Sequence, residues 1–223
     1  MKIGIDILGG DFAPDANVSG AILARKELPK EIGIVLFGDQ NNVLSCLSKF
    51  GADASDFEIV HAPDVITMHD HPTRAISNKP ESSIAVGFEY LAKGEIQAFA
   101  STGNTGAMLV GSIYKINTIP GIIRPCITSS LPTVDGGTSI LLDVGSNADC
   151  KADILYQFGV LGSLYAKNVY HIEKPKVGLL NIGEEETKGN LLTLATHKLL
   201  KESDDIHFIG NVEGRDLFTG VAD

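Results

Sequence analysis

Short apolar runs alternate with longer amphipathic stretches along this chain, and that alternation restricts its fold more than any other feature. The run Gly33–Gly38 is continuously apolar, as strands buried on both faces of a parallel sheet are. The next stretch, Asp39–Phe50, repeats its apolar residues at helical spacing. The pattern predicts an α/β fold: a three-layer, Rossmann-like arrangement with a parallel or mixed sheet between helices.

The expected strands are Lys2–Ile7, Gly33–Gly38, Phe57–His61, Gln97–Ser101, Ile127–Leu131, Ser139–Leu142, Lys176–Asn181 and His207–Asn211. The expected helices are Pro14–Leu28, Asp39–Phe50, Glu81–Lys93, Thr105–Ile116, Ala152–Lys167 and Leu191–Lys201. Between them, His69–Pro80 is polar and without periodicity, which predicts a functional loop or an excursion around residues 62–80. Asp135-Gly136-Gly137 indicates a tight turn between two antiparallel strands and is also a candidate lobe boundary. We expect residues 1–223 to form a single α/β domain.

Composition narrows the class of protein. Hydrophobic residues make up 43% of the 223 residues, enough for a full core, and the formal net charge is −10. An acidic chain without a Lys/Arg cluster repels nucleic-acid phosphate, so we expect no nucleic-acid partner. Three scattered cysteines predict reduced thiols, and no apolar run approaches the roughly 20 residues that span a bilayer.

Two glycine-rich turns follow expected strands, where ligands of open α/β sheets bind. After Asp6, the turn Gly9-Gly10-Asp11 lets the backbone approach a ligand closely, although a plain strand–helix turn explains it equally well. The stretch Ser101–Ala107 places small residues and unpaired N–H groups at the start of a helix, which favours an anion. The alternative is that Asn104 or Thr105 only caps that helix.

Four further turns carry charged or amide side chains. Arg124 precedes a proline and is suited to phosphate or carboxylate, or is a surface arginine. Asp143 comes directly after an apolar strand and is followed by Asn147 in the same turn. Three roles are open for its carboxylate: to bind a metal, to position a base or to cap the next helix. The stretches 181–190 and 210–216 follow two more strands, and the first holds a charge run that is otherwise typical of a solvated face.

In this order, the six turns resemble those of the bacterial phosphate acyltransferase (PlsX) family, and the resemblance runs from Met1 to Asp223. It implies an acyltransferase that forms acyl-phosphate from acyl-[acyl-carrier-protein] and inorganic phosphate. That product leads to glycerol-3-phosphate acylation in phospholipid synthesis. It also implies a fold similar to that of phosphate acetyltransferases and the isocitrate/isopropylmalate dehydrogenase group.

The resemblance implies further properties. The expected partners are acyl-[acyl-carrier-protein], inorganic phosphate, a membrane glycerol-3-phosphate acyltransferase and a second copy in a homodimer. The expected location is the cytoplasm, with peripheral membrane association of the full-length protein, and no cofactor or metal is expected. Two departures stand out: Ser77 occupies a position that is usually basic, and family members continue beyond Asp223, so we expect a C-terminal truncation.

Site residues follow from this resemblance. Lys188, assisted by Asn181 and Asn211, is expected to be catalytic, while Glu185 and Glu186 orient Lys188, and Asp6 and Asp143 position loops. The expected phosphate- and substrate-binding residues are Gly10, Asp11, Gly103, Asn104, Thr105, Gly106, Arg124, Asp143, Asn147, Glu185, Glu186 and Arg215.

Three alternatives stay open. A coenzyme A-dependent phosphate acetyltransferase would differ in the acyl donor. An inactive fragment or binding module would bind phosphate without turnover. A decarboxylating dehydrogenase on the same fold would need a nicotinamide site, but no G-x-G-x-x-G motif is present.

Overall fold

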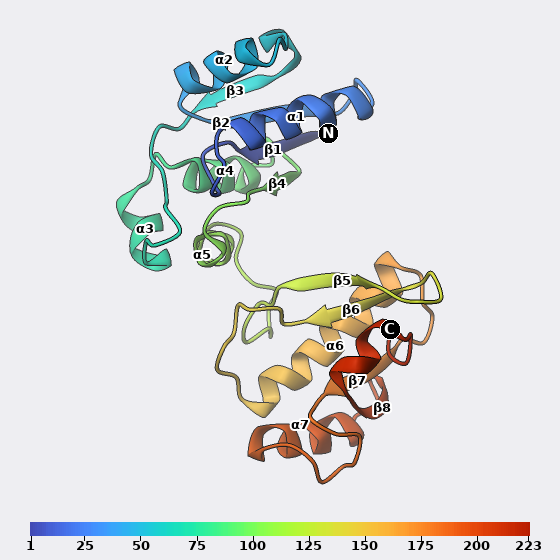
Figure 1. Cartoon of the computed structure of the whole chain (residues 1–223). Coiled ribbons are helices and arrows are strands. Elements are labelled where there is room, and N and C mark those ends of the chain that lie inside the picture. The colour runs from blue at the N-terminus through green and yellow to red at the C-terminus, as the bar shows by residue number, and fades with distance from the viewer. The chain divides into compact units, whose positions relative to one another are not determined.

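A computed structural model describes all 223 residues and divides into two compact units, Met1–Thr118 and Ile119–Asp223 (Figure 1). Both units combine strands with helices, which confirms the α/β class. The division falls between Thr118 and Ile119, whereas Asp135-Gly136-Gly137 lies within the second unit. That the two units act as a single domain stays a prediction.

The first unit contains a four-stranded parallel sheet in the order β3-β2-β1-β4. Its strands are β1 (Lys2–Asp6), β2 (Gly33–Gly38), β3 (Glu58–His61) and β4 (Ala98–Ala100). Its helices are α1 (Asp15–Glu27), α2 (Gln40–Lys49), the short η1 (Ala54–Asp56), α3 (Pro72–Asn78), α4 (Ser83–Ala92) and α5 (Thr105–Lys115). Because the strands are parallel, the turns that follow β1 and β4 leave the same edge of the sheet.

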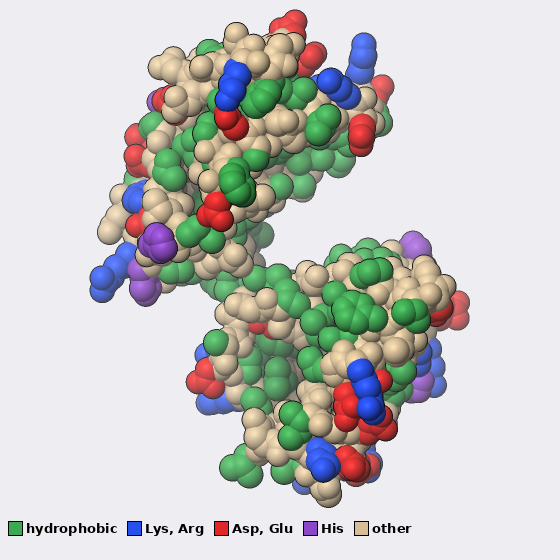
Figure 2. All heavy atoms as spheres, in the orientation of Figure 1, with side chains coloured by type: hydrophobic (Ala, Val, Ile, Leu, Met, Phe, Trp, Pro, Cys, Tyr) green, Lys and Arg blue, Asp and Glu red, His purple; other side chains and the backbone are tan.

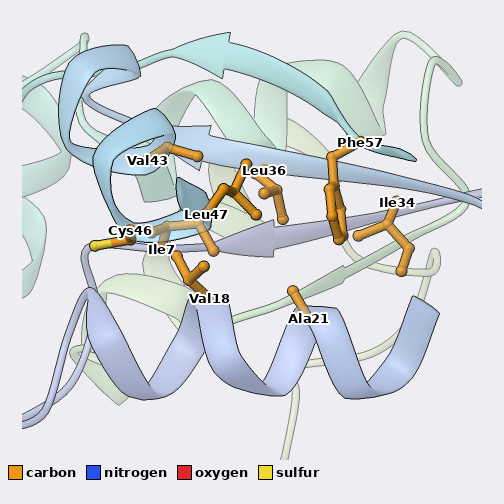
Figure 3. Packing of buried hydrophobic residues seen from close by; sticks show 9 residues of the cluster. All are labelled: Ile7, Val18, Ala21, Ile34, Leu36, Val43, Cys46, Leu47 and Phe57. Atoms are coloured by element: carbon orange, nitrogen blue, oxygen red, sulfur yellow. The ribbon is translucent and has the colours of Figure 1, made fainter. Parts of the chain in front are cut away.

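Strand β2 shows why a continuously apolar run predicted a sheet covered on both faces. Leu36 packs with Val18 of α1 and Leu47 of α2 in one buried cluster (Figure 3). Its neighbour Phe37 belongs to a separate cluster and meets Tyr90 of α4 edge-on, with ring centroids 5.2 Å apart. Adjacent residues of a strand point to opposite faces, so both faces of the central strand are buried.

The sequence predicted a loop between His69 and Pro80. This prediction is wrong, because the segment contains helix α3. Pro72 stands in the first turn, where a missing N–H costs nothing, and Ala75 and Ile76 bury one face. With only seven residues, α3 is too short for a readable period. The start of α4 also differs, since Ser82 caps it through Ala85 N–H and Glu81 lies outside.

The second unit holds two separate pairs of strands. Its elements are β5 (Thr128–Pro132), β6 (Thr138–Leu142), α6 (Ala152–Val169), β7 (Lys176–Leu180), α7 (Leu191–Lys201), β8 (His207–Val212) and η2 (Gly214–Phe218). Strands β5 and β6 pair antiparallel, as the Asp-Gly-Gly turn predicted, and β7 pairs with β8 in parallel. None of the helices in the chain combines the length and apolarity needed to cross a membrane.

Candidate active-site turns

Asp6 connects the two glycine-rich turns of the first unit. Its carboxylate, at the end of β1, is 1% exposed. One oxygen, Oδ1, accepts hydrogen bonds from Leu8 N–H (2.9 Å) and Gly9 N–H (3.1 Å). The other, Oδ2, accepts from Ser101 Oγ (2.6 Å), which in turn accepts from Gly103 N–H (2.9 Å). The carboxylate is fully engaged in holding the backbone of both turns.

The two turns approach so closely that side chains would not fit between them. A Cβ on Gly9 would lie 2.8 Å from Gly103 Cα, well inside van der Waals contact. Gly10 has φ +98° and would meet Thr102 Oγ1 at 2.8 Å if it carried a Cβ. A side chain at Gly9 would clash with the neighbouring turn. Gly10 is restricted both by such a clash and by its positive φ, which favours glycine.

Asn17 is a residue of this site that the sequence analysis missed. Its Nδ2 donates to the carbonyl of Gly9 (2.7 Å), with longer contacts to the carbonyls of Asp6 and Ile7. Thr102 Oγ1 donates to the same Gly9 carbonyl (2.9 Å). An Asn in the first turn of α1 gave no signal, because its partners precede the helix.

The N-terminus of α5 combines a cap with free donors. Asn104 Oδ1 accepts from Ala107 N–H (2.9 Å), so the capping alternative holds for this residue. The next N–H along the helix, that of Met108, donates to Asn104 O (3.0 Å). The Thr105 and Gly106 N–H groups have no acceptor in the chain, and Thr105 is exposed. Two donors at the positive end of a helix dipole are suited to an anion.

Asn104 also anchors the segment before α3. Its Nδ2 donates to the carbonyls of Thr67 (3.0 Å) and Asp70 (3.1 Å). A hydrogen bond from Lys79 (2.7 Å), together with Thr67 N–H, holds the pKa of Asp70 below its usual range. The segment around residues 67–70 is thus hydrogen-bonded to the start of α5.

Ser77, at a position where the resemblance implies a basic residue, is exposed on α3. Its hydroxyl donates to Thr73 O in the preceding turn (3.1 Å). Its hydroxyl makes no hydrogen bond to either of the two glycine-rich turns.

In the second unit, Asp143 organises a turn much as Asp6 does. Its carboxylate accepts from Ile127 N–H (2.7 Å), Ser146 N–H (2.9 Å) and Asn147 N–H (2.6 Å), and from Ser146 Oγ. Burial alone would raise the pKa of Asp143, but these hydrogen bonds outweigh it and the pKa is lowered. These bonds come from Ile127, ahead of β5, and from Ser146 and Asn147 in the turn after β6, so the carboxylate has a positioning geometry.

Two more residues join this turn. Asn147 Nδ2 donates to Pro125 O (2.9 Å), which ties the turn to the segment that carries Arg124. Arg124 is exposed and donates to Asp149 O (2.9 Å), and no carboxylate pairs with it. Its remaining N–H groups are available to an anion.

The loop after β7 carries Lys188. Asn181 Nδ2 donates to Lys188 O (3.1 Å), and Lys188 N–H donates to Glu185 O (3.0 Å). The lysine stem packs over Gly183, where a Cβ would lie 2.9 Å from Lys188 Cγ. Its ammonium group is exposed and has no partner in the chain. An exposed, unpaired ammonium held on a folded loop is suited to neutralising phosphate or an oxyanion.

The carboxylates of this loop are arranged differently from the expectation. Glu186 pairs with Lys201 of α7 (2.6 Å), and this hydrogen bond lowers the pKa of Glu186. Glu184 pairs with Arg215 (2.9 Å). Neither Glu185 nor Glu186 bonds to the Lys188 ammonium, so the expected orientation of Lys188 by these carboxylates is absent. The lysine is positioned by backbone contacts instead.

Asn211 lies near the end of β8, and Arg215 follows this strand in η2. Arg215 is 70% exposed and lies beside Glu184, Glu213 and Asp216, so its charge is already compensated. Asn211 is 8% exposed, and its Nδ2 donates to Glu185 O (2.8 Å), which braces the Lys188 loop. Its Oδ1 is buried without a partner. Asp11, by contrast, is exposed and makes no side-chain hydrogen bond.

Charge is mixed over the surface. On the face drawn in Figure 2, basic side chains mostly lie close to acidic ones, in agreement with ion pairs such as Arg215–Glu184 and Lys201–Glu186. No three or more His, Cys, Asp and Glu side chains are grouped as metal ligands. Lys188 is one of several basic side chains, with Arg124 and Lys151, that form no ion pair, so its candidacy depends on its place in the loop after β7.

Comparison with known proteins identifies relatives of the whole chain. A family model described as fatty acid synthesis protein matches residues 1–223. A phosphate acyltransferase of Dictyoglomus turgidum is 43% identical over all of this chain and 66% of its own length. One of Thermoanaerobacterium thermosaccharolyticum is 46% identical over all of this chain and 65% of its own length. The chain thus spans just under two thirds of the length of these relatives.

Solved structures support the fold. A phosphotransacetylase from Streptococcus pyogenes superposes with a TM-score of 0.67, covering 96% of this chain and 68% of its own, at 16% identity. A branched-chain phosphotransacylase from Enterococcus faecalis V583 gives a TM-score of 0.60 over 97% of this chain and 70% of its own, also at 16% identity. At that identity the likeness concerns the fold, and it confirms the expected similarity to phosphate acetyltransferases.

Proposed function

The chain belongs to the family of fatty acid synthesis proteins, and from this premise we propose that it forms acyl-phosphate from acyl-[acyl-carrier-protein] and inorganic phosphate. Its relatives of 42–46% identity are phosphate acyltransferases. The observation that carries the proposal is the start of α5, where two unpaired N–H groups stand on turns held by Asp6. The unpaired Lys188 supports it.

The chemistry explains why these groups suffice. A phosphate oxygen attacks the thioester carbonyl, the C–O bond forms, the C–S bond breaks, and the thiolate takes up a proton. Phosphate is already anionic at pH 7, so no Ser–His–Asp triad is needed to activate it. Positioning supplies roughly 7–11 kcal/mol of barrier reduction, and donors to the oxyanion supply about 3–4 kcal/mol.

We assign phosphate binding to the N–H groups of Thr105 and Gly106 and to the Gly10 turn, and charge stabilisation to Lys188. Asn181 and Asn211 act on Lys188 by bracing its loop. Asp6, Asp143 and Asn104 position backbone, since their side chains are engaged by hydrogen bonds within the chain. Arg124 is a second candidate contact for an anion.

A proline substitution tests the phosphate site. Thr105 is the first residue of α5, where proline is favourable, so Thr105→Pro deletes one N–H donor without breaking the helix. Thr105→Ala keeps that N–H and removes only the hydroxyl. A charge-assisted hydrogen bond contributes about 1.5–3 kcal/mol, so calorimetry is expected to show phosphate binding about 10- to 100-fold weaker for Thr105→Pro. Equal affinity of the two variants would contradict the assignment.

Lys188→Ala tests the catalytic assignment. Loss of one such group costs about 100- to 1,000-fold in kcat, measured as phosphate-dependent release of carrier thiol. The fold should be unaffected, because the ammonium has no partner. Lys198→Ala is the matched control: an exposed lysine of α7, paired only with Glu202 (3.9 Å), whose loss should leave kcat near normal. Near-normal turnover of Lys188→Ala would exclude the assigned role.

The acyl donor and the partners are part of the proposal. Turnover with acyl-carrier-protein thioester but not with acyl-coenzyme A distinguishes it from a phosphate acetyltransferase. Phosphate binding without turnover with either donor favours a binding module. We further propose a cytoplasmic homodimer that passes acyl-phosphate to a membrane glycerol-3-phosphate acyltransferase; gel filtration with light scattering and liposome flotation test the dimer and peripheral membrane association.

A further inference from the structure

The peptide group that joins Gly9 to Gly10 is hydrogen-bonded on one side only. Its carbonyl accepts from Asn17 Nδ2 (2.7 Å) and from Thr102 Oγ1 (2.9 Å). Its N–H, which belongs to Gly10, has no acceptor in the chain, and Gly10 is partly exposed. A trans peptide is planar, so its C=O and N–H point in opposite directions. The two donors on the carbonyl therefore direct the Gly10 N–H away from Asn17 and Thr102.

The two glycines do not fix this orientation by themselves. A half-turn of the peptide group changes ψ of Gly9 and reverses the sign of φ of Gly10, which is +98°. Glycine adopts positive and negative φ about equally well, so the backbone permits both orientations. In the reversed orientation a carbonyl oxygen would stand where the N–H stands, and it would repel an anion. The groups that bond to the Gly9 carbonyl therefore decide whether this turn attracts or repels phosphate.

Asn17 is held so that it can act only as a donor to this carbonyl. It lies in the first turn of α1, and its Nδ2 also contacts the carbonyls of Asp6 (3.1 Å) and Ile7 (3.3 Å). Its Oδ1 lies 3.2 Å from Thr102 Oγ1, in the turn after β4. With carbonyl oxygens around Nδ2, only one orientation of the amide gives its N–H groups acceptors.

We propose that Asn17, together with Thr102, is a positioning residue that holds the Gly9–Gly10 peptide in the orientation that presents the Gly10 N–H to phosphate. This inference rests on the proposed function, which assigns phosphate binding to the Gly10 turn, and it adds what controls the affinity of that turn. Both side chains act through the Gly9 carbonyl, and neither contacts the phosphate.

Asn17→Asp tests the inference by replacing the donor with an acceptor of the same shape. A carboxylate repels the Gly9 carbonyl and accepts from the Gly10 N–H of the reversed peptide, so that this N–H no longer faces phosphate. Loss of one hydrogen bond to an anion should weaken phosphate binding about 10- to 100-fold, measured by calorimetry. Asn42→Asp is the matched control, because Asn42 is the third residue of α2, exposed and without side-chain hydrogen bonds, and its affinity should stay within about twofold.

Thr102 provides a test without a change of charge. Thr102→Val keeps the shape and removes the hydroxyl, which should weaken phosphate binding about 3- to 10-fold. Thr102→Ser keeps the hydroxyl and should restore most of that loss. In turnover assays, Asn17→Asp and Thr102→Val should raise KM for phosphate, while kcat at saturating phosphate recovers. The reason is that phosphate draws the peptide back to the binding orientation, at the cost of apparent affinity.

Three results would overturn the inference. The first is phosphate binding by Asn17→Asp as tight as by Asn42→Asp, and the second is an equal loss in Thr102→Val and Thr102→Ser. The third is a fall in kcat that saturating phosphate does not restore, together with lower stability in urea, which would mean that the site is disrupted rather than reoriented. Weak binding by Thr105→Pro with normal binding by Asn17→Asp would leave the proposed function standing and remove only the role of Asn17. An unchanged chain that binds no phosphate would overturn both.

Discussion

Replacement of Asp6 is the sharpest test of how the first unit holds its two turns. In Asp6→Ala, Leu8 N–H, Gly9 N–H and Ser101 Oγ lose their acceptor at a position 1% exposed. A hydrogen bond to a charged group contributes about 1.5–3 kcal/mol, and three in one network are not additive. We expect the free energy of unfolding of the first unit to fall by about 3–5 kcal/mol.

The matched variants separate charge from connectivity. Asp6→Asn keeps one acceptor for the two N–H groups but presents an amide to Ser101, so we expect a smaller loss of about 1–3 kcal/mol. Asp11→Ala removes a nearby exposed carboxylate without partners and should stay within about 0.5 kcal/mol of the unchanged chain.

Urea unfolding with hydrogen exchange of the Leu8, Gly9 and Gly103 amides measures the effect. Exchange of the Gly103 amide is informative, because this group is bonded to Asp6 only through Ser101. If Asp6→Ala is as stable as Asp11→Ala, the carboxylate does not hold the turns and the reasoning fails.

Three further outcomes follow from the bonds described above. The pKa of Asp143 is lowered in the folded chain. The stabilisation that this carboxylate contributes is therefore present above its unfolded pKa of about 3.9 and is lost as pH falls through the lower folded value. The free energy of unfolding of Asp143→Asn, measured by acid unfolding, should depend less on pH in this range. Burial raises the pKa of the Cys126 thiol to about 11, so iodoacetamide at pH 8 should alkylate it about two orders of magnitude more slowly in the folded chain than in urea, and equal rates would contradict the burial. Asn104→Asp keeps the cap of α5 but loses both donors to Thr67 and Asp70, so amide exchange around residues 67–70 should quicken while α5 stays protected; Asn104→Ala should in addition lose about 1 kcal/mol of cap stability, measured by urea unfolding.

Local signals in the sequence were sufficient for most of the elements. The bounds of β2 and α7 agree with their predictions to the residue, because a continuous apolar run and a capped amphipathic helix are short-range patterns. Helix α3 was missed since seven residues give too few turns to show a period. The turn-forming glycines, including Gly10, were visible for the same reason as the strands: their requirement is conformational and local.

Side-chain partners could not be predicted in this way. Glu186 bonds to Lys201, and Arg215 to Glu184, across sequence separations of 15 and 31 residues. Nothing in the loop itself signals those pairings, so the sequence assigned Glu186 to Lys188, its near neighbour. Asn17 was missed for a related reason, because its amide bonds to carbonyls of a turn that precedes its own helix.

The sequence by itself therefore determined the α/β class, the positions of the strands and the longer helices, and the turns that carry polar residues, since each depends on the spacing of neighbouring residues. Only the tertiary structure decided which of those polar groups are engaged and which remain unpaired. Asp6 and Asp143 are occupied by backbone N–H groups, whereas Lys188 and the first two N–H groups of α5 have no partner in the chain. The reason is physical: a hydrogen bond depends on distances in space, and residues 95 apart in the chain, such as Asp6 and Ser101, become partners only when β1 and β4 pair.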